Sequence, residues 1–143
     1  MDIKRLTDNF AVSPQIEPGD IAEIVAEGFQ SVICNRPDAE VGTDLSAATI
    51  RSAVESAGLQ WRENVIIGGA MTLENIDLQG QLENELPGPV LAYCRSGTRS
   101  ATAWSLSRAG SEETDDIIAT AAKGGYDLSP LRGQIEAMAT RTD

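Results

Sequence analysis

Short apolar segments alternate along this chain with segments whose apolar residues recur every three or four positions. The short segments Ser31–Asn35, Leu59–Ile67 and Val90–Tyr93 have the β-rich composition of buried strands, and glycine, proline or polar residues bound them. Strands that alternate with helices build a parallel or mixed sheet with helices packed against it. The sequence therefore predicts a single α/β domain over residues 1–143, with a central parallel or mixed sheet flanked by helices.

Caps and glycine stops bound the helical segments, and the segments before and between them are short. The chain is expected to open with a hairpin of Ile3–Leu6 and Phe10–Val12, and Arg36–Asp44 is expected to be a loop because it contains Pro37 and Gly42. The predicted helices are Pro18–Glu27, Ser46–Ala57, Thr72–Glu85, Ser100–Ala109, Thr114–Lys123 and Ser129–Thr140.

Charge and composition exclude several classes of function. The 143 residues include 22 acidic and 11 basic side chains, a formal net charge of −11, so repulsion disfavours nucleic acid and anionic membranes as partners. The chain has no histidine, which removes Ser-His-Asp and Cys-His nucleophiles and imidazole zinc sites. Two cysteines are too few for a disulfide scaffold, and no apolar run reaches the length of about 18–20 residues that crosses a membrane. We expect a cytoplasmic protein that needs no metal or organic cofactor.

The segment Val90–Trp104 carries the chemistry. A buried strand leads to Cys94, and a tight loop then leads directly into a helix, whose unpaired N–H groups and positive dipole end favour an anion. A cysteine in this position beside arginine is favoured as the thiolate, so Cys94 is the predicted nucleophile and needs no histidine. Gly97 allows the bend, and Arg99 offers a two-pronged donor to an oxyanion.

Four further residues complete the predicted anion-binding loop. Ser100 either hydrogen-bonds the thiolate or caps the helix, and Arg95 is either a substrate contact or a solvated charge. The loop is predicted to comprise Arg95, Ser96, Gly97, Thr98 and Ser100.

Two segments resemble known families. Tyr93–Ala101, which reads Tyr-Cys-x-x-Gly-x-Arg-Ser-Ala, resembles the active-site loop of rhodanese-type sulfurtransferases, whereas the similar loop of dual-specificity cysteine phosphatases is one residue longer. Gly28–Glu40 is similar to an element of phosphatase-like folds. From Ile3 to about Ala109 the chain is identified as a member of the beta-lactamase hydrolase-like protein, phosphatase-like domain family. The resemblance implies the dual-specificity phosphatase fold.

The chemistry of the loop leaves three alternatives. The segment Ile66–Thr72, where phosphatases of this fold place an aspartate general acid, contains no acid, and the shorter loop suits a single sulfur better than a phosphoryl group. Both observations favour a sulfurtransferase that carries a Cys94 persulfide taken from a donor such as thiosulfate or glutathione persulfide and passes it to a thiol acceptor. The alternative is a phosphatase that acts on a phosphorylated substrate through a cysteinyl-phosphate, with Asp38 or Glu40 as a substitute acid. The second alternative is a non-catalytic anion-binding module.

Three residues at or after the end of the predicted strand Ser31–Asn35 are candidate accessory residues: Cys34, Arg36 and Asp38. Some phosphatases of similar fold keep a second cysteine at the position of Cys34, and this resemblance implies a reversible disulfide with Cys94. Burial statistics favour the alternative of a packed core cysteine. The sequence leaves this choice open, together with the physiological substrate and the oligomeric state.

Overall fold

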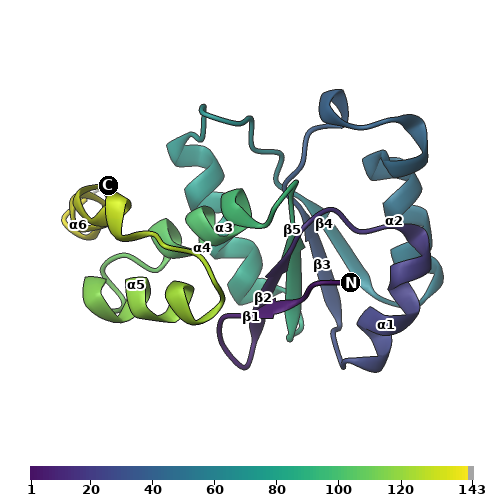
Figure 1. Ribbon diagram of the computed structural model, residues 1–143, viewed down its shortest axis with the longest axis horizontal. Coiled ribbons are helices and arrows are strands. Elements are labelled where there is room, and N and C mark those ends of the chain that lie inside the picture. The colour runs from purple at the N-terminus through teal and green to yellow at the C-terminus, as the bar shows by residue number, and fades with distance from the viewer. Residues whose placement is uncertain (142–143) are drawn as a thin grey trace.

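A five-stranded sheet in the order β1-β2-β5-β3-β4 forms the centre of the computed structural model, which describes residues 1–141 (Figure 1). The β1 strand is antiparallel to β2, and all other neighbours are parallel. The strands are β1 (Lys4–Arg5), β2 (Phe10–Ser13), β3 (Ser31–Cys34), β4 (Gln60–Glu63) and β5 (Val90–Tyr93). The predicted α/β fold with a parallel or mixed sheet is confirmed, and the sheet is mixed and mostly parallel.

Helices cover both faces of the sheet. The α1 and α2 helices lie on one face, and α3, α4, α5 and α6 lie on the other (Figure 1). Each side has its own core: Trp104 of α4 stacks on Phe10 with ring centroids 6.3 Å apart, and Trp61 packs against Tyr93 on the opposite side. The helices are α1 (Ile21–Ala26), α2 (Ala47–Ser56), α3 (Leu73–Glu85), α4 (Thr98–Ser107), α5 (Thr114–Lys123) and α6 (Arg132–Ala139), with 3₁₀ turns at Pro18–Asp20, Asp38–Glu40, Thr43–Leu45 and Ser129–Leu131.

The central strand β5 has the same bounds as the predicted one. All four of its residues are buried, and it pairs in parallel with β2 on one side and β3 on the other. A strand covered on both faces has no polar alternation, which explains its unbroken apolar sequence. Because β5 lies in the middle of the sheet, the residue that follows it emerges between the ends of β2 and β3.

Two predicted boundaries, the end of β4 and the start of α4, differ from those of the structure. The β4 strand ends at Glu63 rather than continuing to Ile67, because the side chain of Asn64 turns toward α3 and donates to the carbonyl oxygen of Asn75 at 2.8 Å. The α4 helix begins at Thr98 instead of Ser100, with Gly97 as its N-cap. The earlier start places Thr98 and Arg99, in addition to Ser100, inside the first turn of the helix.

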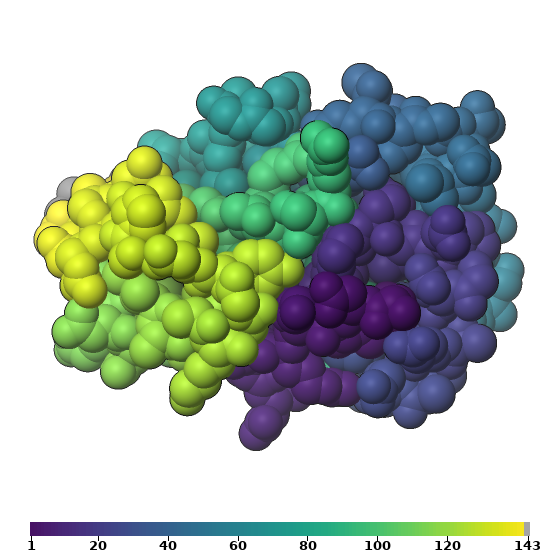
Figure 2. Space-filling model, viewed as in Figure 1, coloured from purple at the N-terminus to yellow at the C-terminus, as the bar shows by residue number. Residues whose placement is uncertain are grey.

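The C-terminal segment packs against the beginning of the chain. Figure 2 shows the yellow-green C-terminal part beside the purple N-terminal part, with the green segment after β5 next to both. The buried Gly124 lies so close to Leu6 that a β-carbon at this position would overlap the leucine side chain. No helix within residues 1–141 is both long enough and apolar enough to cross a membrane.

Candidate active site

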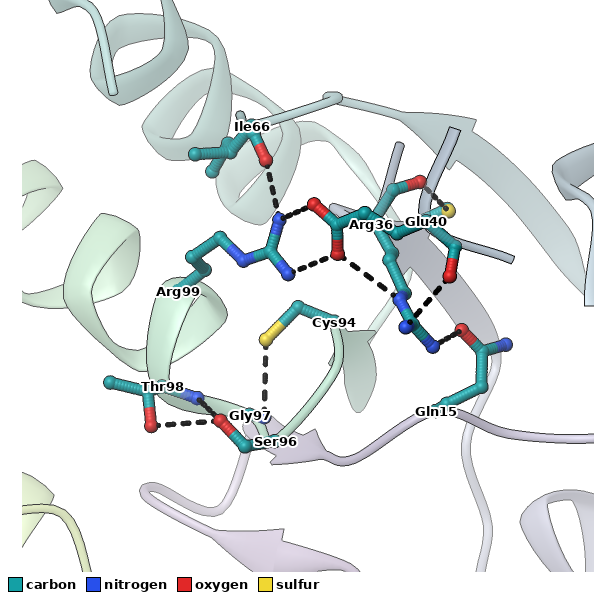
Figure 3. Close-up of polar contacts among 10 residues, drawn as sticks. Gln15, Arg36, Glu40, Ile66, Cys94, Ser96, Gly97, Thr98 and Arg99 are labelled. Carbon is teal, nitrogen blue, oxygen red and sulfur yellow. Dashed lines mark hydrogen bonds and ion pairs between the residues drawn. The ribbon is translucent and has the colours of Figure 1, made fainter. Parts of the chain in front are cut away.

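Cys94 lies directly after β5, at the start of the loop that leads into α4. Its side chain is buried, with 1% of the residue exposed. Gly97 adopts a φ of 93°, which glycine tolerates and which turns the backbone back toward the cysteine. The N–H of Gly97 then donates to the Cys94 sulfur at 3.1 Å (Figure 3). Hydrogen bonds of this kind stabilise the thiolate form, as does the N-terminal end of the helix.

The other loop residues hold the backbone in this shape. The Ser96 hydroxyl donates to the Thr98 hydroxyl at 3.0 Å and accepts from the Thr98 N–H at 3.4 Å. Arg95 is exposed, and its carbonyl oxygen accepts from the N–H of Gln15 at 3.2 Å. The next N–H groups of α4, those of Arg99 and Ser100, have no partners within the helix, so they remain able to bind the oxygens of an anion.

Arg99 is held beside Cys94 by a carboxylate that is distant in the sequence. Its two terminal nitrogens donate to Glu40 at 2.8 and 2.6 Å, and one of them also donates to the carbonyl oxygen of Ile66 at 2.9 Å (Figure 3). Arg36 contacts the same carboxylate at 3.3 Å and reaches the Gln15 amide oxygen at 3.1 Å. The structure therefore brings Arg36, Glu40 and Arg99 into one cluster at the mouth of the loop.

Both members of the Arg99–Glu40 pair are held in their charged forms. The Arg99 guanidinium, followed by Arg36, lowers the pKa of Glu40 from its ordinary value. Glu40 in turn raises the pKa of Arg99, and Cys94 adds to that effect. Because a two-pronged donor already binds one carboxylate, an incoming anion either replaces Glu40 or binds to the remaining N–H groups of Arg99.

A cavity of about 380 Å³ opens next to Arg99. It is bordered on one side by the segment after β4, including Ile67, which is 61% exposed. The cavity has no carboxylate in its lining, which consists of Ile66, Ile67, Gly69, Met71, Thr98, Arg99, Thr102 and Gln134. It can therefore accept an apolar group that is attached to an anion bound at the loop.

Ser100 does neither of the two things expected of it. It is fully buried in the first turn of α4, and its hydroxyl donates to the side-chain oxygen of Asn35 at 2.7 Å rather than to the thiol. Asn35 in turn donates to Gln79 of α3 at 2.9 Å, and Asn64 donates to the same oxygen. This buried polar network joins α4 to the ends of β3 and β4.

The three candidate accessory residues have different surroundings. Arg36 belongs to the cluster at the loop, whereas Asp38 accepts a hydrogen bond from the N–H of Ala47 at 2.7 Å and so caps α2. Cys34 is buried, with its sulfur 3.5 Å from the carbonyl oxygen of Arg36, and burial raises the pKa of its thiol.

The two cysteines are free thiols: Cys34 ends β3, and Cys94 follows directly after the parallel neighbour β5. Cys34 is the register partner of Tyr93, and both side chains belong to the core beneath α1 and α2. Successive residues of a strand point to opposite faces, so Cys94 is directed away from Cys34. The implied disulfide stays a prediction, and this arrangement does not favour it.

Sequence reasoning missed Tyr126, which approaches the loop from the segment after α5. Its hydroxyl donates to the carbonyl oxygen of Ser96 at 3.1 Å. The two residues are 30 positions apart, and no motif connects them. The contact follows only from the packing of α5 and α6 against α4.

Comparisons with known proteins agree with this geometry. The model of the family "Beta-lactamase hydrolase-like protein, phosphatase-like domain" matches residues 2–111. A beta-lactamase hydrolase-like protein of Agrobacterium fabrum is 30% identical over 130 residues, which cover 90% of this chain and 30% of that protein. A similar protein of Xylella fastidiosa is 27% identical over 144 residues, 33% of its length. The chain thus spans about a third of the curated relatives it matches.

Solved structures show the same fold. The crystal structure of a proposed phosphatase from Neisseria meningitidis has 31% identity and a TM-score of 0.85, over 96% of this chain and 99% of that one. The core catalytic domain of a PP-IP phosphatase from S. cerevisiae has a TM-score of 0.67 over 95% of this chain and 84% of that one. At 13% identity, the second likeness concerns the fold alone.

Proposed function

The chain belongs to the beta-lactamase hydrolase-like protein, phosphatase-like domain family, and from that membership we propose that it is a cysteine-dependent phosphatase of phosphoric monoesters. The observation that carries the proposal is the arrangement of three loop residues. Cys94 lies at the end of the central strand, Gly97 donates its N–H to the sulfur, and Arg99 stands in the first turn of the helix. Thiolate, backbone donors and guanidinium are the three elements that a phosphoryl group requires.

The reaction proceeds in two steps through the cysteine. The Cys94 thiolate attacks phosphorus, so an S–P bond forms while the P–O bond to the leaving group breaks and its electron pair stays on the leaving oxygen. The loop N–H groups and Arg99 bind the non-bridging oxygens as their negative charge increases. Water then attacks phosphorus, the S–P bond breaks, and the thiolate and inorganic phosphate are released.

Departure of the leaving group is the step at which this site differs from a site with a carboxylic acid as proton donor. Ile66–Thr72 contains no acid, and Glu40 is kept ionised by its two arginines, so neither supplies a proton to the leaving oxygen. A leaving oxygen of low basicity departs without that proton. The cavity beside Arg99 accepts an apolar group. The preferred substrate class is therefore a monoester with an apolar, weakly basic leaving group, such as an aryl phosphate.

The direct test is the hydrolysis of para-nitrophenyl phosphate, followed by intact-mass analysis after acid quenching during turnover. We expect release of phosphate and a mass gain of one phosphoryl group on the peptide that contains Cys94. The Cys94→Ser variant should be inactive, and Cys34→Ser is the matched control that removes the other thiol and retains turnover. Turnover by Cys94→Ser at the wild-type rate would rule out the mechanism.

Sulfur transfer is the second candidate. Two observations favour it: only four residues separate Cys94 from Arg99, and Ile66–Thr72 lacks an acid. In that reaction the thiolate attacks the sulfane sulfur of thiosulfate, a new S–S bond forms, and sulfite leaves with the electron pair of the broken S–S bond. Cyanide then removes the sulfur as thiocyanate.

Intact-mass analysis after incubation with thiosulfate distinguishes the two candidates. One added sulfur on Cys94, removed by cyanide, together with no phosphoryl adduct, would replace the phosphatase proposal with sulfur transfer. The absence of both adducts would instead indicate the non-catalytic anion-binding module.

A further inference from the structure

Tyr126 and Cys94 are bound to opposite ends of one peptide unit. The Tyr126 hydroxyl donates to the carbonyl oxygen of Ser96 at 3.1 Å, and the N–H of Gly97 donates to the Cys94 sulfur at 3.1 Å. That carbonyl and that N–H belong to the same planar amide, the one between Ser96 and Gly97. A continuous chain of hydrogen bonds therefore runs from a residue after α5 to the nucleophile.

We propose that Tyr126 is a positioning residue that raises the reactivity of Cys94 through the Ser96–Gly97 peptide unit. The inference rests on the proposed function only in taking Cys94 as the nucleophile, and it holds for phosphoryl and sulfur transfer alike. Tyr126 touches neither the sulfur nor a substrate in this role, because it acts through the amide.

Two physical effects support this role. A donor on the carbonyl oxygen fixes the plane of the amide, and so keeps the N–H of Gly97 directed at the sulfur. The same donor polarises the amide, and hydrogen bonds in a chain strengthen one another. Cys94 is 1% exposed, so little water competes with this N–H for the charge on the sulfur.

The residue types at both ends of the contact fit it. Gly97 has a φ of 93°, and a β-carbon built on it would overlap the Tyr126 hydroxyl, so the close approach requires glycine on conformational and steric grounds. On the other side, the N–H of Tyr126 bonds back to Ala121 at 3.0 Å, and Gly125 has a φ of 94°. This turn ends α5 and directs the tyrosine toward the loop.

The hydroxyl remains a donor because of its surroundings. Burial, and then the charges of Cys94 and Asp2, raise the pKa of Tyr126 from its ordinary value. The other charged groups at the thiol are Arg99 from α4 and Glu40, which reaches it through that arginine. The raised pKa keeps the Tyr126 hydroxyl protonated at neutral pH, so it remains able to donate a hydrogen bond.

The hydrogen bond of Tyr126 to the loop comes from a part of the chain outside the residues that the family model matches. The family model matches residues 2–111, whereas Tyr126 lies in the segment that continues through α5 and α6. That segment is therefore part of the active site and more than a cover for the core.

The test measures the alkylation of Cys94 by iodoacetamide as a function of pH, without substrate, in wild type and Tyr126→Phe. The variant keeps the ring and loses only the hydroxyl. We expect the midpoint of the pH profile to move up by about 0.5 pH unit, because the thiolate loses part of one charge-assisted hydrogen bond. The value of kcat/KM for para-nitrophenyl phosphate should fall about 3- to 10-fold. Peptide mapping assigns the alkylated cysteine.

Tyr93→Phe is the matched control, since it is the chain's other tyrosine and immediately precedes Cys94. Its hydroxyl is buried in the core beneath α1 and α2, away from the loop amide. Its alkylation midpoint should equal that of wild type. The proposal is overturned if Tyr126→Phe leaves the midpoint unchanged, or lowers only the thermal midpoint as a purely structural residue would. A shifted midpoint without phosphatase turnover would leave this inference intact and contradict only the proposed function.

Discussion

The α4 helix carries an arginine–glutamate pair at each end, and the two pairs behave in opposite ways. At the N-terminal end, Arg99 binds Glu40 through two nitrogens at 2.8 and 2.6 Å, and the pKa of Glu40 is lowered. Near the C-terminal end, Arg108 lies 3.5 Å from Glu83 of α3, and the pKa of Glu83 is raised to about 8. The same two residue types therefore produce a fixed charge at one end and a titrating group at the other.

Burial and geometry account for the difference. The Glu40 side chain is 30% exposed and is contacted by two arginines, so both solvent and two cations stabilise its negative charge. The Glu83 side chain is 2% exposed, its second oxygen has no hydrogen-bond partner among residues 1–141, and desolvation outweighs the attraction of Arg108. The Arg99–Glu40 pair is thus accessible to solvent and to an incoming anion, whereas the Arg108–Glu83 pair has its carboxylate buried in the protein.

The largest expected effect comes from replacing the cation of the accessible Arg99–Glu40 pair. Arg99→Lys keeps the charge but loses the two-pronged donor, so kcat/KM for para-nitrophenyl phosphate should fall about 100- to 1,000-fold. Arg108→Lys, the same substitution near the other end of the helix, should keep the activity within about 3-fold, since Arg108 lies outside the site. Equal losses in the two variants would show that α4 matters for folding alone.

The next expected effect is on stability, and it tests through pH the contrast between the buried Glu83 and the accessible Glu40. The raised pKa of Glu83 means that its stabilising contribution is present below the ordinary carboxyl pKa and is lost as the pH rises through about 8. Glu83→Gln should therefore be about 1–3 kcal/mol more stable than wild type at pH 9 and nearly equal to it at pH 4. Urea unfolding across this range measures the difference.

Glu112→Gln is the control for that experiment. Glu112 contacts the same arginine at 3.9 Å but is 38% exposed, so its removal should leave the pH dependence of the free energy of unfolding as it is. A wild-type stability that does not decline between pH 5 and pH 9 relative to Glu83→Gln would contradict the raised pKa.

The sequence predicts the parts of this site that are local. The strand Val90–Tyr93 is bounded by Pro89 and by the loop, and the spacing of Cys94, Gly97 and Arg99 alone places them in one turn. The tertiary contacts were not predictable in the same way. Ser100 and Asn35 are 65 positions apart, and Arg99 and Glu40 are 59 apart.

Those long-range contacts depend on which strands are neighbours. The loop after β3 lies beside the loop after β5 only because the strand order places β3 next to β5. Periodicity and spacing carry no information about that order. Local sequence patterns therefore predict the nucleophile and the anion-binding arginine, whereas the groups that orient them are defined only by the assembled sheet.

The smallest expected effect comes from replacing the anion of the accessible Arg99–Glu40 pair. Glu40→Gln removes the carboxylate that competes with substrate for Arg99, so inorganic phosphate should inhibit the variant at about a 5-fold lower concentration than wild type. Because the pKa of Glu40 is lowered, the pair is fully formed at neutral pH, and the difference should disappear only at a pH below the ordinary carboxyl pKa, where Glu40 becomes protonated. Glu55→Gln, which removes a surface partner of Arg51, is the control. Weaker inhibition of Glu40→Gln by phosphate would mean that Glu40 orients Arg99 for the anion instead of competing with it.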